Sequence, residues 1–109
     1  MSETLVPVFP VFVALADDTR WAVLQELGRA ELSASALAAI LPVTRQAIAK
    51  HLAVLADAGL VEPVRVGREV RYRALGARLN QTARALEAIG AEWDRRLSAL
   101  TRVAEALEG

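Results

Sequence analysis

The sequence predicts a mainly α-helical α+β domain, and three observations lead to this fold class. Two short segments with helical spacing flank a tight turn at Pro42. The next segment, 61–74, shows the near alternation of a β-hairpin, and residues 77–108 then carry one continuous heptad pattern. With 109 residues, the chain has the length of one domain, and we expect residues 1–109 to form it.

The composition excludes several classes of protein. Hydrophobic residues make up 54% of the chain and charged residues 24%, which favours a globular rather than a disordered chain. Cysteine is absent, which excludes disulfide scaffolds, zinc–thiolate sites and thiol redox sensing. No segment has the length of a membrane span, and the N-terminal apolar run lacks the basic start of a signal peptide. A soluble, cytoplasmic protein is therefore expected.

Two helices are expected at the N-terminus. The apolar segment 8–16 is expected to be helical after Pro10. Asp17 then suits the N-cap of a second helix, which runs roughly over residues 18–27 and has Gly28 as a natural stop. One face of this helix, expected to lie in the core or at an interface, carries Trp21, Leu24 and Leu27.

Residues 34–58 predict a helix–turn–helix. The connector 29–32 before them is short enough to form an isolated bridge strand. Ser33 can cap a helix over 34–41, and Thr44 can cap a second helix over 45–58. Two capped helices joined by so tight a turn are typical of DNA-binding helix–turn–helix pairs.

The second of these helices has two different faces. Ile48, Leu52 and Leu55 recur at helical spacing and form an apolar stripe. Gly59 is the expected left-handed residue after the helix. The opposite face is polar, small and cationic, and carries Gln46, Ala49, Lys50 and Ala53. Such a face suits insertion into a DNA groove, and an ordinary amphipathic surface helix is the alternative.

Residues 61–74 predict a basic β-hairpin around Gly67-Arg68. A three-residue loop would pair Val64 with Val70, whereas a two-residue loop would shift these pairs, and the pattern leaves both registers open. Residues 44–73 hold six basic and three acidic side chains, a net charge of +3, although the whole chain is neutral. A basic hairpin after such a helix indicates a wing that neutralises DNA phosphates, and an ordinary surface hairpin is the alternative.

The long C-terminal segment 77–108 predicts a dimerisation helix. Its apolar residues step by four and three positions along a heptad seam, at Leu79, Ala83, Leu86, Gly90, Trp93, Leu97, Leu100, Ala104 and Leu107. Such a helix is longer than the rest of the domain can cover. We therefore expect it to pair with a second copy, together with segment 8–16, rather than to fold back on its own domain.

Three consecutive segments resemble the ArsR-type (arsenical-resistance repressor) winged-helix family. FVALADDTRWAVLQEL is similar to its opening signature, LSASALAAILPVTRQAIAKHLAVLADAGLV to its helix–turn–helix, and VRVGREVRYRAL to its wing, over about residues 9–75. The resemblance implies a homodimeric transcription repressor that binds an inverted-repeat operator in double-stranded DNA. It also implies dimerisation through the first and last helices.

The resemblance and the side-chain chemistry together predict the site residues. Arg45 and Arg68 are expected at phosphates, Gln46 at adenine, and Lys50 at phosphate or guanine. His51 is the only histidine, and a partly buried structural role is its alternative. The predicted DNA-binding set is Thr44, Arg45, Gln46, Lys50, His51, Arg65, Arg68, Arg71 and Tyr72. The predicted dimer interface is Phe9, Phe12, Leu86, Gly90, Trp93, Leu97 and Leu100.

Metal sensing and catalysis are not expected. Family members that sense metals use Cys thiolates or Asp/His/Glu sets on the last helix, and this chain has neither Cys nor a His there. Asp17 and Asp18 have no second catalytic group beside them, and capping accounts for both, so neither an enzyme nor a cofactor is predicted. The remaining alternatives are a protein–protein interaction module and a regulator with a small-molecule site at the dimer interface, near Trp93.

Overall fold

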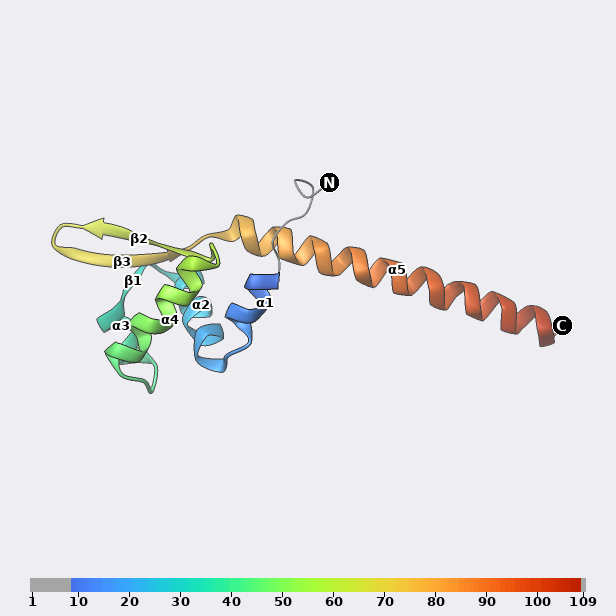
Figure 1. The fold of residues 1–109 in the computed structure, drawn as a ribbon, viewed down its shortest axis with the longest axis horizontal. Coiled ribbons are helices and arrows are strands. Elements are labelled where there is room, and N and C mark those ends of the chain that lie inside the picture. The colour runs from blue at the N-terminus through green and yellow to red at the C-terminus, as the bar shows by residue number, and fades with distance from the viewer. Residues whose placement is uncertain (1–8, 109) are drawn as a thin grey trace.

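The structure, a computed structural model, describes residues 9–108 and consists of a small head with one long helix projecting from it (Figure 1). The molecule measures 71 × 35 × 20 Å. Its elements are α1 (Phe9–Leu15), α2 (Asp18–Arg29), β1 (Leu32–Ser33), α3 (Ala34–Ile40), α4 (Arg45–Asp57), β2 (Val61–Val66), β3 (Glu69–Ala74) and α5 (Gly76–Glu108). The predicted fold class is confirmed. Position 8 of the predicted first helix lies outside the described residues.

The three predicted N-caps are confirmed. In each, a short polar side chain accepts a hydrogen bond from a backbone N–H that would lack a partner in the first turn. The acceptor and donor residues are Asp17 and Arg20 (3.0 Å), Ser33 and Ala36 (3.1 Å), and Thr44 and Ala47 (3.1 Å).

Several predicted helix boundaries were wrong by one or two residues. The third helix ends at Ile40 rather than 41, the fourth ends at Asp57 rather than 58, and the last begins at Gly76 rather than 77. The first helix begins at Phe9 rather than after Pro10. Proline is tolerated there because the first turn offers no acceptor for its missing N–H. The second helix continues through Gly28 to Arg29, and Ala30 ends it by turning extended. Gly59, by contrast, has the predicted positive φ of 77° after α4.

The core lies where α1, α2, α3 and α4 meet the sheet. The predicted stripe of α4 is confirmed, because Ile48, Leu52 and Leu55 are all fully buried. Trp21 is not part of this core: it is 53% exposed, and Val23 takes the inward position on α2. The other buried apolar residues are Val11, Ala14, Leu27, Leu37, Ala58, Leu60 and Val61.

The sheet has three antiparallel strands in the order β1-β3-β2. Val66 pairs with Glu69, so the hairpin has the two-residue loop, Gly67-Arg68. Gly67 has φ +64°, the positive value that a type II′ turn requires at its first central residue. The expected bridge strand is present as β1, where Leu32 lies opposite Tyr72.

Only the first turns of α5 pack against the head. Leu79 packs against the core and Thr82 is 5% exposed, whereas Ala83, on the predicted seam, is exposed. Every residue from Leu86 to Glu108 is exposed. The helix leaves the head on the side away from the hairpin tip (Figure 1). No helix among residues 9–108 combines the length and apolar character needed to cross a membrane.

Candidate nucleic-acid interface

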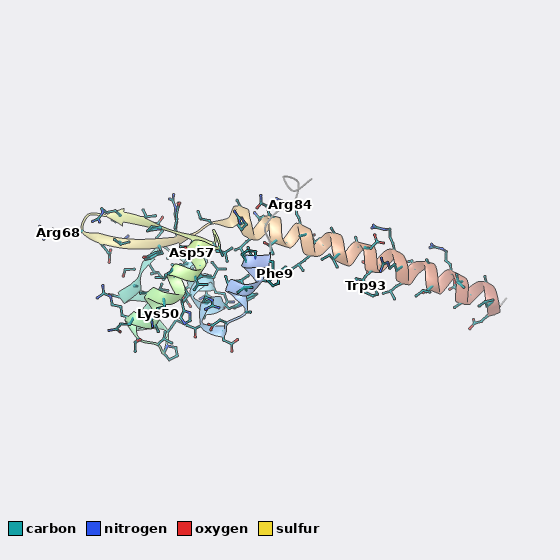
Figure 2. The ribbon with its side chains drawn as sticks, viewed as in Figure 1. Phe9, Lys50, Asp57, Arg68, Arg84 and Trp93 are labelled. Atoms are coloured by element: carbon teal, nitrogen blue, oxygen red, sulfur yellow. The ribbon has the colours of Figure 1, made fainter. Side chains whose placement is uncertain are left out.

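The outer face of α4 is fully open to solvent. Since Ile48, Leu52 and Leu55 anchor the helix to the core, the residues at the intervening positions face outward. Lys50 lies on this helix, below the hairpin that carries Arg68 at its tip (Figure 2). The exposed residues of α4 and its N-cap are Thr44, Arg45, Gln46, Ala49, Lys50, Ala53, Val54 and Asp57.

A groove of about 420 Å³ separates α4 from the hairpin. Arg45 reaches it from the first turn of α4, and Arg68 reaches it from the hairpin turn. Hydroxyl groups line it as well, from the N-cap Ser33 and from Ser35 in the first turn of α3, and from Tyr72 on β3. Two guanidinium groups and several hydroxyl donors thus converge on one open groove, a set of donors that suits phosphate oxygens.

The basic residues differ in whether a carboxylate neutralises them. Arg71 pairs with Glu69, its Nε lying 2.7 Å from Oε1, and Arg73 pairs with Glu62. Within residues 9–108, the other four basic side chains of α4 and the hairpin form no ion pair; these are Arg45, Lys50, Arg65 and Arg68. The uncompensated positive charge therefore lies on α4 and the hairpin residues nearest the turn.

The strand register assigns the hairpin residues to two faces. Glu62 lies opposite Arg73 and Val64 opposite Arg71, so these four share one face. Arg65 lies opposite Val70 on the other face, which it shares with Tyr72. Tyr72 packs against the core, so that face is turned toward the head. Of the predicted wing residues, Arg68 and Tyr72 therefore line the groove, whereas Arg71 lies on the outer face of the hairpin.

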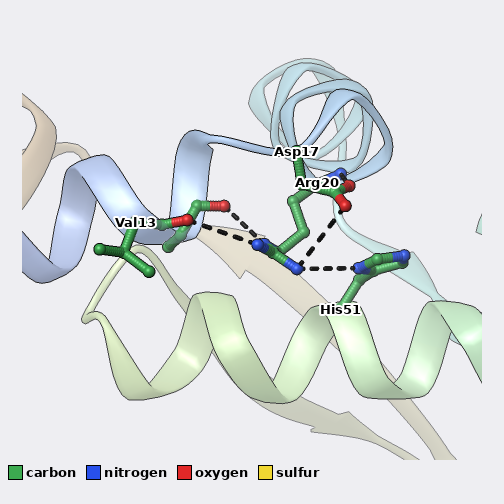
Figure 3. Close-up of polar contacts among 5 residues, drawn as sticks. Val13, Asp17, Arg20 and His51 are labelled. Carbon is green, nitrogen blue, oxygen red and sulfur yellow. Dashed lines mark hydrogen bonds and ion pairs between the residues drawn. The ribbon is translucent and has the colours of Figure 1, made fainter.

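His51 points away from the outer face of α4 and toward α2 (Figure 3). Its Nδ1 lies 3.4 Å from Nη1 of Arg20. The Arg20 guanidinium also donates to two carbonyls at the end of α1, from Nε to Ala14 at 2.6 Å and from Nη2 to Val13 at 3.4 Å. Because arginine can only donate, a hydrogen bond here requires Nδ1 of His51 to accept.

Sequence reasoning missed the role of Arg20, whose side chain is only 17% exposed. The one local signal was its position three residues after the cap Asp17. The backbone N–H of Arg20 donates to Asp17 and holds the pKa of that carboxyl below its usual 3.8, and the nearby Arg20 charge acts in the same direction. Arg20 therefore joins the end of α1, the start of α2 and the middle of α4.

The apolar side chains predicted for a dimer interface are exposed on α1 and α5. Phe9 is 73% exposed and Trp93 57% exposed. The guanidinium of Arg96 lies 5.8 Å from the centre of the Trp93 ring. The same face of α5 also exposes Leu86, Gly90, Leu97 and Leu100, while Phe12 is exposed on α1. Sequence reasoning missed two further exposed apolar residues of α5, Ile89 and Val103, which follow seam leucines by three residues. They lie beside the seam because the apolar stripe of a straight helix drifts relative to a strict seven-residue repeat.

Residues 9–108 do not form a metal-binding cluster. No three side chains of His, Cys, Asp or Glu lie close enough there to hold a metal ion together. The side chains gathered at the groove are nitrogen and hydroxyl donors, and the carboxylate beside them, Glu69, is paired with Arg71.

A helix–turn–helix with an open basic face, followed by a hairpin wing across a basic groove, defines a winged helix–turn–helix DNA-binding protein. A family model described as a helix-turn-helix domain matches residues 15–64. A curated relative from Bacillus subtilis (strain 168), the uncharacterized HTH-type transcriptional regulator YuzN, is 49% identical over 72 residues, which are 60% of this chain and 75% of the relative.

Solved structures are similar over most of the chain. An ArsR-like transcriptional regulator from Rhodococcus sp. RHA1 is 67% identical and has a TM-score of 0.81, with 89% of this chain and 92% of that chain covered. The homodimeric winged helix-turn-helix domain of Mb0332 from Mycobacterium bovis, a possible ArsR-family regulator, is 29% identical, with a TM-score of 0.62 and coverage of 83% and 81%. The chain belongs to the ArsR family of transcriptional regulators and is a DNA-binding regulator, as the resemblance predicted.

Proposed function

We propose that the chain is a homodimeric repressor that binds an inverted-repeat operator, with α4 of each subunit in a major groove. The observation that carries this proposal is the groove between Arg45 and Arg68, whose guanidinium groups face open space and form no ion pair within residues 9–108. A DNA backbone strand that passes between a recognition helix and a wing presents its phosphates to both elements.

Contacts to DNA phosphates and contacts to base edges are made by different parts of the site. Arg45, Arg68 and the Tyr72 hydroxyl hold phosphates in the groove, and Arg65 extends this set along the wing. Gln46 and Lys50, on the open face of α4, reach base edges: the amide pairs with adenine, and the ammonium with guanine or a phosphate. His51 and Arg71 are left out of the proposed contacts, since His51 meets Arg20 and Arg71 lies on the outer face paired with Glu69.

A second copy of the chain covers the exposed apolar face of α5. The helix has 33 residues and is about 50 Å long at 1.5 Å per residue, and it has no neighbour within residues 9–108 from Leu86 onward. An apolar stripe of this length needs a partner to be removed from water. The homodimeric state of the relative Mb0332 supports a second copy as that partner. Two-fold symmetry then places the half-sites about one helical turn apart, ~34 Å.

Repression follows from occupancy of a promoter. A dimer seated on an operator excludes polymerase from the same stretch of DNA, in the cytoplasm where the chromosome lies. The sign of this regulation, repression rather than activation, rests on the family resemblance. No effector or cofactor is needed for the proposed DNA contacts, which use only side chains of this chain.

Fluorescence anisotropy with DNA from upstream of the protein's own gene tests the proposal, with a random duplex of equal length as the control. The expected result is binding that survives near-physiological salt, with the random duplex ~10³-fold weaker. The double variant Lys50→Ala/Arg68→Ala should lose this binding, while sedimentation equilibrium still shows a dimer. Equal, salt-sensitive binding to both duplexes would contradict the proposal and point to an acidic protein as the partner of the basic surface.

A further inference from the structure

The end of α4 is joined directly to the start of α5. The backbone N–H of Leu60 donates to the carbonyl of Leu55 at 2.9 Å, and that of Gly59 donates to Ala56 at 3.0 Å. With the positive φ of Gly59, these two bonds form a Schellman motif, which fixes the chain as it leaves the helix. The carbonyl of Leu60 in turn accepts from the backbone N–H of Leu75 at 2.8 Å, and α5 begins at the next residue.

The side chain of Arg78, in the first turn of α5, covers this junction. A Cβ added at Gly59 would lie 3.5 Å from Cζ of Arg78, 3.6 Å from Nη2 and 3.8 Å from Nε. Because the central atom Cζ is the nearest, the flat face of the guanidinium covers Gly59. Arg78 is half-buried and forms no ion pair within residues 9–108. A cation at this place also suits the partial negative charge at the C-terminal end of α4.

Only a short part of α5 is held by the head. Leu79 packs against the core and Thr82 is buried, whereas every residue from Leu86 to Glu108 is exposed. The helix has 33 residues, so its first two turns determine the direction of the whole element. Because the anchored part is so short, each contact in it has a large effect on the angle between α5 and the head. Arg78 makes its contact at the end of α4, the helix that faces DNA in the proposed complex.

We propose that Arg78 is a positioning residue that fixes α4 relative to α5 and thereby sets the spacing of the operator half-sites that the dimer accepts. This inference rests on the proposed homodimer, in which α5 of each subunit pairs with that of the other. The two-fold axis relates the two copies of α4, so the angle between α4 and α5 in one subunit fixes the distance and inclination between both recognition helices. Arg78 acts through Gly59 and contacts no DNA itself.

The experiment begins with selection of bound duplexes from a random library of about three helical turns by the full-length protein. The half-sites of the selected duplex are then moved apart or together by one or two base pairs. Each base pair changes their separation by ~3.4 Å and their relative rotation by ~35°. A rigid dimer that engages only one half-site should lose about 10²-fold in affinity, measured by fluorescence anisotropy. For Arg78→Ala we expect a loss below about tenfold, because α4 can then turn relative to α5 and follow the displaced half-site.

Two further variants assign the effect to the contact between Arg78 and Gly59. Gly59→Asn keeps a residue that tolerates positive φ, but its side chain displaces the guanidinium, so it should reproduce the relaxed spacing. Arg84→Ala, the matched control, removes the same charge from an exposed position of α5 and should keep the spacing penalty of the parent (Figure 2).

The outcome at altered spacings separates a positioning role from a merely structural one. An equal spacing penalty in the parent, Arg78→Ala and Gly59→Asn would overturn the inference while leaving the proposed function intact. A uniform loss of affinity at every spacing, or a parent that binds all spacings equally, would overturn it as well. A selection that enriches no sequence would overturn the proposed function and, with it, this inference.

Discussion

Nη1 of Arg20 lies 3.4 Å from Nδ1 of His51, which joins the start of α2 to the middle of α4 (Figure 3). The same guanidinium donates to the carbonyls of Val13 and Ala14 at the end of α1. A helix end normally leaves such carbonyls without a partner. Arg20 thus donates hydrogen bonds to carbonyls at the end of α1, and its contact with His51 fixes the position of α4 relative to that helix.

Replacing Arg20 with alanine should destabilise the head. The substitution leaves the partly buried Ala14 carbonyl and His51 without their donor, whereas the exposed Val13 carbonyl keeps the Ala16 backbone N–H, and the expected cost is about 1–3 kcal/mol in the free energy of unfolding. Urea denaturation at a fixed protein concentration measures this cost. Arg29→Ala is the matched control. Its side chain is 72% exposed and, among residues 9–108, pairs only with Glu26, so we expect a change within about 0.5 kcal/mol. Equal effects of both variants would contradict the bridging role of Arg20.

The lowered pKa of Asp17 predicts a pH-dependent contribution to stability. A carboxyl whose pKa is lower in the folded than in the unfolded chain stabilises the fold fully above the unfolded value, near 3.8, and loses this contribution as the pH falls through the folded value. An asparagine side chain at this position would cap α2 nearly as well but without charge. Urea midpoints of the parent and of Asp17→Asn should therefore differ at pH 7 and converge below pH 3.8. A difference that stays constant across this range would rule out the charge effect.

Replacing Gly90 with alanine tests whether α5 packs closely against a second copy of the chain. A Cβ added at Gly90 meets nothing within 4 Å in the single chain, so helix propensity alone would make Gly90→Ala stabilising. If a second copy approaches closely at this position, the added methyl should instead raise the dimer dissociation constant in sedimentation equilibrium. Gly28→Ala, on the open side of α2, is the control and should stabilise by about 0.8–1.0 kcal/mol without affecting the dimer. A tighter Gly90→Ala dimer would contradict close packing there.

Local chemistry was enough to predict much of this fold. The caps at Asp17, Ser33 and Thr44, and the left-handed Gly59, each depend on a few neighbouring residues. The hairpin register was different, because the alternation of residues 61–74 is compatible with either loop length. The pairing of Val66 with Glu69 in the folded chain is what distinguishes the two-residue loop from the three-residue loop.

The candidate site was predictable in part. Alternation along a strand places Arg71 and Tyr72 on opposite faces, so this rule could have separated the two residues from the sequence alone. The contact between Arg20 and His51 was out of reach, since it joins residues 31 positions apart and depends on how α2 packs on α4. The groove likewise depends on the folded chain, which brings Arg68 of the hairpin turn and Arg45 of α4 into one lining.

The salt dependence of operator binding tests the role of the groove most directly. Removing one phosphate contact should lower the slope of log K against log salt by about 0.9. A dimer carries two copies of each arginine, so Arg45→Gln/Arg68→Gln should remove four contacts and lower the slope by about 3.6. The control, Arg29→Gln/Arg73→Gln, removes the same charge from exposed positions outside the groove and should leave the slope nearly unchanged. Equal reductions of the slope in both double variants would show that the groove has no special part in holding DNA.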